Sequence, residues 1–237
     1  DQINLSIVLC TYNEAKNVEN TLISLRNQQT SAKFEIIGVD NGSSDSTSAI
    51  LMAYVDYLLY CDKRGKIPCM RVGVRHAKGD IVALADADTI YPVDWIEQAF
   101  SCFNKIGKPV LVFGQSYMGM KPTFLSYILS SLFVRLSFLC GVGCSVGFNM
   151  AARRVELSKV LEQIGEVGLS GWGIGTALLR QYGRSKAMYE PKMTAPKCMR
   201  RIHNRGWIFA FSLWVGEWVR LATGNNLSVT ESEYYGF

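Results

Sequence analysis

The chain has 237 residues, of which 49% are apolar, and 25 Lys and Arg stand against 20 Asp and Glu. This length allows one domain with a substantial core, or at most two small ones. The basic excess favours anionic partners, but the absence of zinc-finger spacing and of an aromatic RNA-binding motif argues against nucleic acid. Seven cysteines, an odd number, with no secretory signal at the start predict reduced thiols and a cytoplasmic location.

The first half alternates strand and helix patterns. Strands are predicted over 5–10, 34–40 and 81–86, and helices over 14–28, over 66–78 and from Pro92 onward. Pro68 falls in the first turn of its helix, where a missing amide costs least. The alternation predicts parallel strands with helical crossovers, and hence a doubly wound α/β sheet.

The stretch 123–148 is long and apolar enough to raise the question of a membrane span. Arg135 lies in its middle, and four serines dilute it. A charge at the bilayer centre is costly, so a core helix followed by a strand is the better prediction.

The C-terminal part combines basic and aromatic residues. Five cations and no acid lie between residues 192 and 205, before an aromatic-rich helix pattern over 206–222. One interpretation is a peripheral contact with anionic lipid on the cytoplasmic face of a membrane. The other is a helix packed on the sheet with its tryptophans, Trp207, Trp214 and Trp218, in the core.

The stretch "GDIVALADADT" carries two carboxylates at the end of a predicted buried strand. Asp86 and Asp88 would project to one side of an extended chain, where they repel unless a cation or several donors lie between them. Ligands bind at this end of the strands in open α/β sheets. The alternative is a surface loop with two solvated aspartates.

Four stretches in order carry a resemblance to a known family: "SIVLCTYNEAKNVENTL", "EIIGVDNGSSDST", "GKIPCMRVGVRHAKGDIVALADADT" and "VGFNMAARR". Together they resemble family 2 of the nucleotide-sugar-dependent glycosyltransferases, over roughly residues 5–155. The resemblance implies a single A-type glycosyltransferase domain over 1–195, with a Rossmann-like, mostly parallel sheet flanked by helices. Its nucleotide-binding half would be 1–90 and its acceptor half 91–195, followed by a basic, aromatic helical extension over 196–237.

The resemblance also implies roles for the first half. Asp88 would ligate Mn²⁺ or Mg²⁺ on the diphosphate of a UDP-sugar or GDP-sugar, and Asp86 would lie nearer the ribose and the water shell of the metal. The nucleotide pocket would include residues at the ends of the first two strands: Thr11, Tyr12, Asn13, Glu14 and Asp40. Asp45 better suits a helix N-terminal cap.

Two further basic residues are implied to face the donor phosphates. Lys66 and Arg71 lie in a segment similar to that of the dolichyl-phosphate mannose synthases. The alternatives are a solvated helix face for Lys66 and a salt bridge at the edge of the core for Arg71.

On the acceptor side, "GFNMA" matches a family segment that lines the sugar pocket. The implied acceptor residues are Gly147, Asn149, Arg153 and Trp172. Polyprenyl-phosphate enzymes usually carry an arginine at the position of Asn149. In this chain Arg135, Arg153 or Arg154 could supply the phosphate contacts instead. The segment "RRIHNRGW" loosely resembles the diphosphate-holding element of processive relatives, which makes Arg201, His203 and Arg205 candidates for that role.

The sequence departs from the family at the acidic pair whose aspartate takes the acceptor proton. The pair would fall at about Ile174 and Gly175, and no carboxylate lies between Glu166 and Glu190. The acceptor could be an already ionised polyprenyl phosphate, Glu166 could act as a displaced base, or activity could be lost, leaving a nucleotide-sugar-binding protein. We favour an inverting enzyme with a lipid-linked acceptor, either a polyprenyl phosphate or a lipid-linked saccharide. A soluble saccharide acceptor remains the other possibility.

Overall fold

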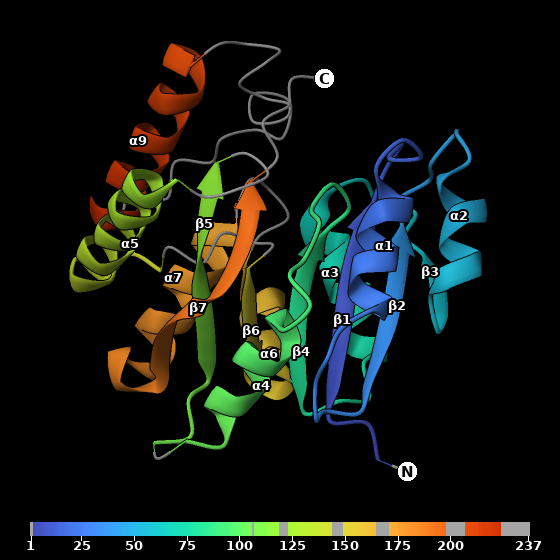
Figure 1. Cartoon of the computed structure of the whole chain (residues 1–237), viewed down its shortest axis with the longest axis horizontal. Coiled ribbons are helices and arrows are strands. Elements are labelled where there is room, and N and C mark those ends of the chain that lie inside the picture. The colour runs from blue at the N-terminus through green and yellow to red at the C-terminus, as the bar shows by residue number, and fades with distance from the viewer. Residues whose placement is uncertain are drawn as a thin grey trace.

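The computed structural model describes residues 2–105, 107–118, 123–143, 149–164, 171–197 and 207–223. These residues form a seven-stranded sheet in the order β3-β2-β1-β4-β6-β5-β7 (Figure 1). The strands are β1 (Leu5–Thr11), β2 (Phe34–Asp40), β3 (Tyr57–Tyr60), β4 (Ile81–Asp86), β5 (Leu111–Met118), β6 (Met150–Arg153) and β7 (Ala187–Lys197). The helices are α1 (Val18–Arg26), α2 (Thr47–Tyr54), α3 (Lys66–His76), α4 (Trp95–Phe103), α5 (Phe124–Leu139), α6 (Arg154–Gln163), α7 (Gly171–Tyr182) and α9 (Trp207–Thr223), with a 3-10 turn at Arg184–Lys186.

The sheet is parallel except around β6. β1 pairs in parallel with β2 and β4, and β2 with β3, as the alternation of strand and helix patterns predicts. β6 is antiparallel to both β4 and β5. The chain therefore leaves β6 at the edge of the sheet where β4 begins.

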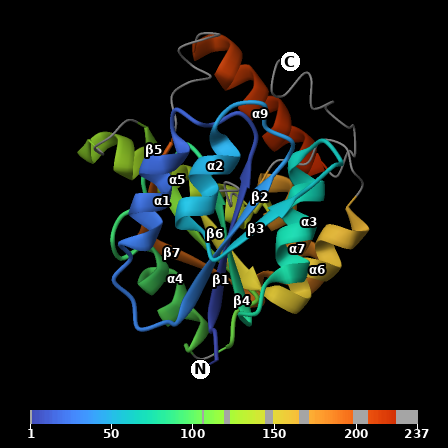
Figure 2. The same ribbon diagram turned by 90° about the vertical axis from the view of Figure 1, so that its right-hand side faces the viewer.

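Helices cover both faces of the sheet (Figure 2). On one face, α1, α2 and α4 pack on the strands around the fully buried Trp95. On the other face, α3, α6 and α7 pack around residues such as Met70, Leu161 and Ile174. Strands buried on both faces explain the continuous apolar run of β4. The prediction of an A-type, mostly parallel sheet flanked by helices is confirmed.

The predicted elements of the first half are present, with shifts at their ends. α1 begins at Val18 instead of residue 14, because the amides of Asn17 and Val18 both donate to Glu14 O in a preceding turn. Pro92 likewise precedes its helix, and Asp94 is the N-cap residue of α4. β3 is an additional, short strand.

The prediction of a core helix for the apolar stretch in the second half is wrong in one respect. α5 forms, and β6 follows it, but α5 lies at the surface with eight large apolar side chains exposed. Val134 and Ser137 are its buried positions. No helix within the described ranges has both the length and the apolarity needed to cross a bilayer.

The C-terminal helix α9 packs against α5. The Trp218 Nε1–H donates to Ser137 Oγ at 2.9 Å, and Trp218 is partly buried against the core. The side chains of Trp207 and Trp214 lie outside what the structure describes. β7 extends to Lys197, two residues past the predicted end of the catalytic domain.

Candidate active site

The carboxyl ends of three parallel strands meet at one edge of the sheet. Thr11 is the register partner of Asp40, and Cys10 is the partner of Asp86. The sequence therefore correctly predicts that Thr11, Asp40 and Asp86 lie together at the edge where open α/β sheets bind ligands.

The loop after β1 is held by the loop after β2. Asn13 has a left-handed backbone (φ 51), a conformation that Asn tolerates better than most residues. Its N–H donates to Ser43 Oγ at 3.0 Å, and its Oδ1 accepts from the Ser44 N–H at 2.8 Å. The Glu14 N–H donates to Thr47 Oγ1 at 2.8 Å. This interlock fixes the backbone that carries Tyr12 and Glu14.

The two aspartates of the second loop differ in role. Asp40 is 1% exposed and accepts from the Ser43 N–H at 3.2 Å. Asp45 accepts from the N–H of Thr47 at 3.0 Å and from that of Ala15 at 3.2 Å. The hydrogen bond from the Thr47 hydroxyl lowers the pKa of Asp45. Asp45 thus has the structural role that was expected, but it precedes the N-cap residue of α2, Ser46, instead of being the cap itself.

Asn41 and Arg64 are two residues of this edge that the sequence analysis missed. The buried Asn41 amide donates to the carbonyls of Cys61 and Lys63, each at 2.8 Å, and accepts from the Gly65 N–H at 2.8 Å. The Arg64 guanidinium lies 3.2 Å from the centroid of the Tyr12 ring and donates to Asn41 O at 3.0 Å. Asn41 could have been predicted from the sequence, because it directly follows the strand that ends in Asp40.

Lys66 lies beside the paired aspartates. Its ammonium forms an ion pair with Asp86 Oδ1, and the two side chains are 23% and 27% exposed. Lys66 is the first residue of α3, so the N-terminus of that helix also faces this edge. The structure thus brings together Lys66 and Asp86, both of which the resemblance implies would contact the donor nucleotide sugar.

Asp88 lies in a turn just beyond β4, so the two carboxylates are not related by strand alternation as the sequence analysis expected. Both lie near the buried Tyr91, whose hydroxyl accepts from the Asp86 N–H at 2.9 Å. Burial raises the pKa of Tyr91 well above its ordinary value, and the charges of Asp86 and Asp88 add to this effect. The sequence analysis did not identify Tyr91 as a residue of this site.

Arg71 is not brought to the site. Its guanidinium donates to Leu161 O at 2.7 Å and to Ile164 O, at the C-terminal end of α6. Cations are favourable at helix C-termini, which explains this placement. The alternative of a structural contact at the edge of the core is the better description, although the partners are carbonyls instead of a carboxylate.

Arg153 lies at the opposite edge of the sheet, as the register partner of Ile81, and donates to Pro109 O at 3.1 Å. Arg154 donates from Nε to Gly79 O at 2.9 Å on the same side. β6 is antiparallel to β4, so residues that follow Asn149 run away from Asp86. Neither arginine is therefore placed to contact an acceptor.

Asn149 is fully buried, and its amide holds three elements together. Its Nδ2 donates to Gln115 O at 2.8 Å and to Met193 O at 3.0 Å. Its Oδ1 accepts from the Trp95 Nε1–H at 2.8 Å. Both amide protons are thus committed to the protein.

Several expected site residues cannot be placed. Gly147, Glu166, Arg201, His203 and Arg205 lie outside the described residues. Trp172 belongs to α7, but its side chain is not described. Ile174 and Gly175, the positions of the expected acidic pair, are buried in α7 against the core.

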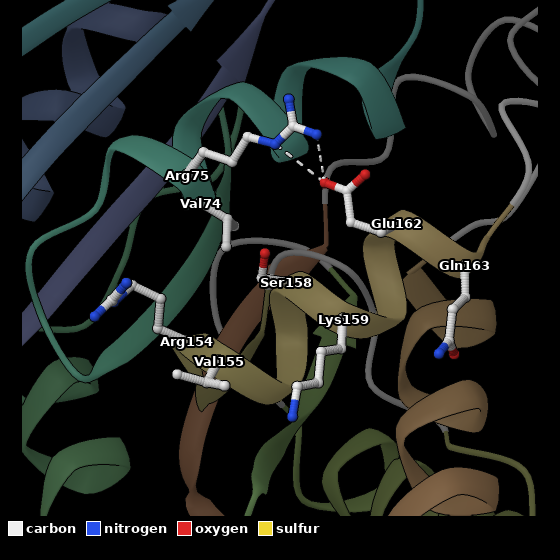
Figure 3. Close-up of a pocket in the computed structure, with 8 residues that line it drawn as sticks. All are labelled: Val74, Arg75, Arg154, Val155, Ser158, Lys159, Glu162 and Gln163. Carbon is white, nitrogen blue, oxygen red and sulfur yellow. Dashed lines mark hydrogen bonds and ion pairs between the residues drawn. The ribbon is translucent and has the colours of Figure 1, made fainter.

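A shallow hollow between α3 and α6 lies elsewhere on the molecule (Figure 3). Arg75 and Glu162 form an ion pair at 2.8 Å in its lining, and the Lys159 side chain points away from that pair. Arg75 is nine residues after Lys66 on α3, or about 13 Å along the helix axis. This hollow is therefore separate from the edge that holds Asp86.

The donor set at the β4 edge fits a hard divalent cation. Asp86 ends β4 and Asp88 follows in the next turn, and both carboxylates lie near Tyr91. The described residues contain no cluster of three or more His, Cys, Asp or Glu that could enclose a metal by itself. Mg²⁺ is commonly held by one or two carboxylates together with substrate phosphates. Asp86 and Asp88 would supply the protein share of such a site.

This mostly parallel sheet flanked by helices has the architecture of the A-type glycosyltransferases. The model of the family described as "Glycosyl transferase family 2" matches residues 6–157, and the chain belongs to this family. The resemblance found in the sequence is therefore confirmed.

Two curated relatives and two solved structures define the likeness. The chain is 27% identical over 110 residues to glycosyltransferase AglE of Haloferax volcanii, covering 44% of this chain and 36% of that protein. It is 29% identical over 165 residues to chondroitin synthase of Escherichia coli, covering 67% and 23%. The chain thus spans about a third or less of these relatives.

The fold likeness extends over nearly the whole chain. The mannosyltransferase PcManGT of Pyrobaculum calidifontis, solved with GDP-Man and Mn²⁺, superimposes with a TM-score of 0.66 at 19% identity, covering 94% of this chain and 63% of that one. Glucosyl-3-phosphoglycerate synthase of Mycobacterium tuberculosis, solved with Mn²⁺, UDP and glucosyl-3-phosphoglycerate, gives 0.64 at 18%, covering 94% and 80%.

Proposed function

We propose that this chain is an inverting glycosyltransferase that moves a sugar from a nucleoside-diphosphate sugar to a lipid-linked acceptor. The observation that carries the proposal is the arrangement of Lys66, Asp86 and Asp88 at the carboxyl end of β4. A cation and two adjacent carboxylates at this position suit a diphosphate bound through a divalent metal.

The residues of the nucleotide half would divide the work of holding the donor. The interlocked loops after β1 and β2 hold Tyr12 and Asp40 for the nucleoside, and Arg64 stacks on Tyr12 at the rim. Asp86 and Asp88 would hold Mn²⁺ or Mg²⁺, which supplies charge stabilisation to the leaving diphosphate. Lys66 places a second positive charge beside it. UDP and GDP both suit this site, and the two solved neighbours carry one each.

The acceptor is inferred from a missing group. The positions of the expected acidic pair, Ile174 and Gly175, are buried and apolar. A sugar hydroxyl would need a positioned base, which is typically worth about 10²- to 10⁴-fold in rate. A phosphate monoester, with a second pKa near 6, is already ionised at neutral pH. A polyprenyl phosphate is thus the favoured acceptor, ahead of a lipid-linked saccharide.

The lipid-linked acceptor is supported by the basic segment over 192–205. It precedes the aromatic helix α9, and such a pairing suits the anionic cytoplasmic face of a membrane. We therefore propose a peripheral location there.

The metal role is tested by Asp88→Ala, with Asp80→Ala as the matched control. Asp80 is an exposed aspartate at the opposite end of β4. Donor hydrolysis and transfer, with and without Mn²⁺, should fall by about 10³-fold in Asp88→Ala only, since charge stabilisation by a metal is worth several kcal/mol. Unchanged nucleotide affinity and turnover would contradict the assignment. A chain that binds the nucleotide sugar without hydrolysis or transfer would be a binding protein instead.

The acceptor is tested by a screen of polyprenyl phosphates and saccharides, run with the natural chain and with Glu166→Gln. Transfer to polyprenyl phosphate that survives the substitution supports the proposal. Transfer only to sugar hydroxyls, abolished by Glu166→Gln, would make Glu166 the base and a saccharide the acceptor.

A further inference from the structure

Helix α5 turns its polar side toward the protein. Ser130 Oγ donates to the Ser116 carbonyl at 2.5 Å, and Ser131 Oγ lies 3.1 Å from Tyr189 OH. Ser137, 1% exposed, accepts from the indole of Trp218. Three of the four serines that dilute the apolar stretch therefore hydrogen-bond with groups of the protein.

The opposite side of α5 is apolar and exposed. Its exposed fractions run from 44% for Ile128 to 83% for Phe124. The full set is Phe124, Leu125, Ile128, Leu129, Leu132, Phe133, Leu136 and Leu139. Half of the sixteen large exposed apolar side chains of the described residues are thus on this one helix. A surface helix of a water-soluble domain has the reverse arrangement, so this face points to an apolar environment.

The C-terminal helix α9 adds exposed apolar side chains next to α5. α9 is tied to α5 through Trp218 and adds the exposed Val215 and Val219, at 43% and 47%. Figure 1 shows both helices on the left, at the side of the molecule away from α1 and α2. We call the exposed apolar residues of α5 with Val215 and Val219 the α5–α9 face.

The charged side chains that α5 and α9 leave at the surface, Arg135 and Arg220, are positive. Residues 123–143 contain Arg135 and no acid. Arg135 is exposed and lies 5.3 Å from the centroid of the Tyr189 ring. Glu217, the acid of α9, is 8% exposed. An apolar surface bordered by cations complements anionic lipid, whereas two copies of it would bring like charges together.

We propose that the α5–α9 face inserts into the headgroup and acyl boundary of a bilayer that contains anionic lipid. α5 would supply the apolar insertion, and Arg135 of the same helix would attract the headgroups. The inference deepens the proposed function, since it gives a lipid-linked acceptor a surface on which to approach. The biological role of this membrane contact rests on the proposed function, but vesicle binding can be measured without it.

The test is vesicle co-sedimentation of two charge-matched double variants. Leu129→Glu with Leu136→Glu alters the α5–α9 face, and Ile23→Glu with Met52→Glu places the same charges on exposed apolar positions of α1 and α2. The vesicles are phosphatidylcholine alone, or phosphatidylcholine and phosphatidylglycerol in equal parts. The α5 variant should bind at least about tenfold more weakly than the control, because two exposed Leu side chains that would insert into the bilayer are replaced by carboxylates.

The outcomes separate the possible occupants of the face. Equal binding of the two variants would overturn the proposal, as would absence of binding by the natural chain. A dimer in light scattering that only the α5 variant abolishes, without vesicle binding, would assign the face to a second copy. The measurement needs neither donor nor acceptor, so failure here leaves metal-dependent donor hydrolysis, tested by Asp88→Ala, unaffected. Circular dichroism and thermal unfolding of both variants control for misfolding.

A second readout places α5 itself at the lipid. Cys140 is exposed and directly follows α5. A polarity-sensitive fluorophore on Cys140, in a chain with Cys144→Ser and Cys198→Ser, should shift its emission to the blue on addition of vesicles. An emission spectrum unchanged by saturating vesicles would contradict insertion of α5.

Discussion

The β4 edge and the α5–α9 face arrange their polar groups in opposite ways. Around Asp40, Asn41 and Asp86, polar side chains are packed against one another in the loops that end the strands. On α5, polar side chains face the protein and apolar side chains face out. The first region is built to hold a polar ligand in a fixed geometry. The second is built for an apolar surrounding, and its helix α5 packs on β5 of the sheet whose β4 carries the first region.

Asn149 lies where these two regions join. Its amide connects Trp95, which packs at 4.2 Å between ring centroids on Tyr91 beside the paired aspartates, with Gln115. The Gln115 side chain accepts from Tyr189 OH at 2.7 Å, and Tyr189 contacts α5. One buried residue thus supports both the candidate active site and the base of the α5–α9 face.

Removing this junction should have the largest effect on stability. Asn149→Ala would remove the acceptor of the Trp95 Nε1–H and the side-chain donor to the carbonyls of Gln115 and Met193. We expect a loss of about 3 kcal/mol or more in the free energy of unfolding, because each buried unsatisfied group costs about 1–3 kcal/mol. Urea unfolding measures it.

Gln98→Ala is the control for this variant. Gln98 donates to Asp94 on a partly exposed side of α4, and its loss should stay within about 0.5 kcal/mol. Equal effects of the two substitutions would mean that Asn149 is not the junction its contacts indicate.

The sequence predicts the first region better than the second, for a physical reason. Short parallel strands with helical crossovers place Thr11, Asp40 and Asp86 at one edge by topology alone. The direction of β6 is not visible in the pattern "VGFNMAARR", and its antiparallel pairing moves Arg153 to the wrong edge. Predictions based on local pattern therefore succeed where connectivity fixes direction, and fail where the chain reverses.

The orientation of α5 was hidden for a different reason. An apolar stretch with scattered serines predicts a helix, but periodicity does not tell which side meets the protein. Ser130 and Ser137 lie inward because Ser116 O and Trp218 need partners there. Similarly, Arg64 is identified as a residue of the candidate site only from the structure, because its partner Tyr12 is far from it in the sequence.

A smaller loss of stability should follow when a side chain is added at Gly143, where the chain after α5 closely contacts α7. A Cβ on Gly143 would lie 2.3 Å from the Gly175 carbonyl carbon and 2.5 Å from Thr176 N. Backbone cannot yield as a side chain does, so Gly143→Ala should cost about 2 kcal/mol. Thermal unfolding measures the change.

Gly216→Ala is the matched control within α9. A Cβ at this position meets nothing within 4 Å. Alanine should therefore be neutral or should stabilise the helix by up to about 1 kcal/mol. Destabilisation by both substitutions would argue against a specific contact at Gly143.

At the β4 edge, Lys66→Met should weaken donor binding more than folding. The substitution keeps the length of the side chain but removes the charge beside Asp86. We expect KM for the nucleotide sugar to rise about tenfold, the equivalent of one charge-assisted contact worth about 1.4 kcal/mol. Lys159→Met, in the hollow of Figure 3, removes an exposed lysine far from this edge and should leave KM unchanged. A matching rise in both variants would indicate a general charge effect.

The smallest expected effect concerns Tyr91 and has a pH signature. Tyr91→Phe removes the acceptor of the Asp86 N–H and should cost about 1 kcal/mol at neutral pH. Burial raises the pKa of Tyr91 in the folded protein above its ordinary value of 10.0, so the folded state keeps the proton that the unfolded state loses. The natural chain should therefore lose stability as pH rises above that value, and the Phe variant should lose less. Urea unfolding at about pH 7 and at about pH 11 should show the gap between the two chains narrowing. Tyr60→Phe, at a tyrosine that is 59% exposed, should leave the alkaline dependence unchanged. A gap that stays constant or widens with pH would show that Tyr91 ionises freely beside Asp86 and Asp88.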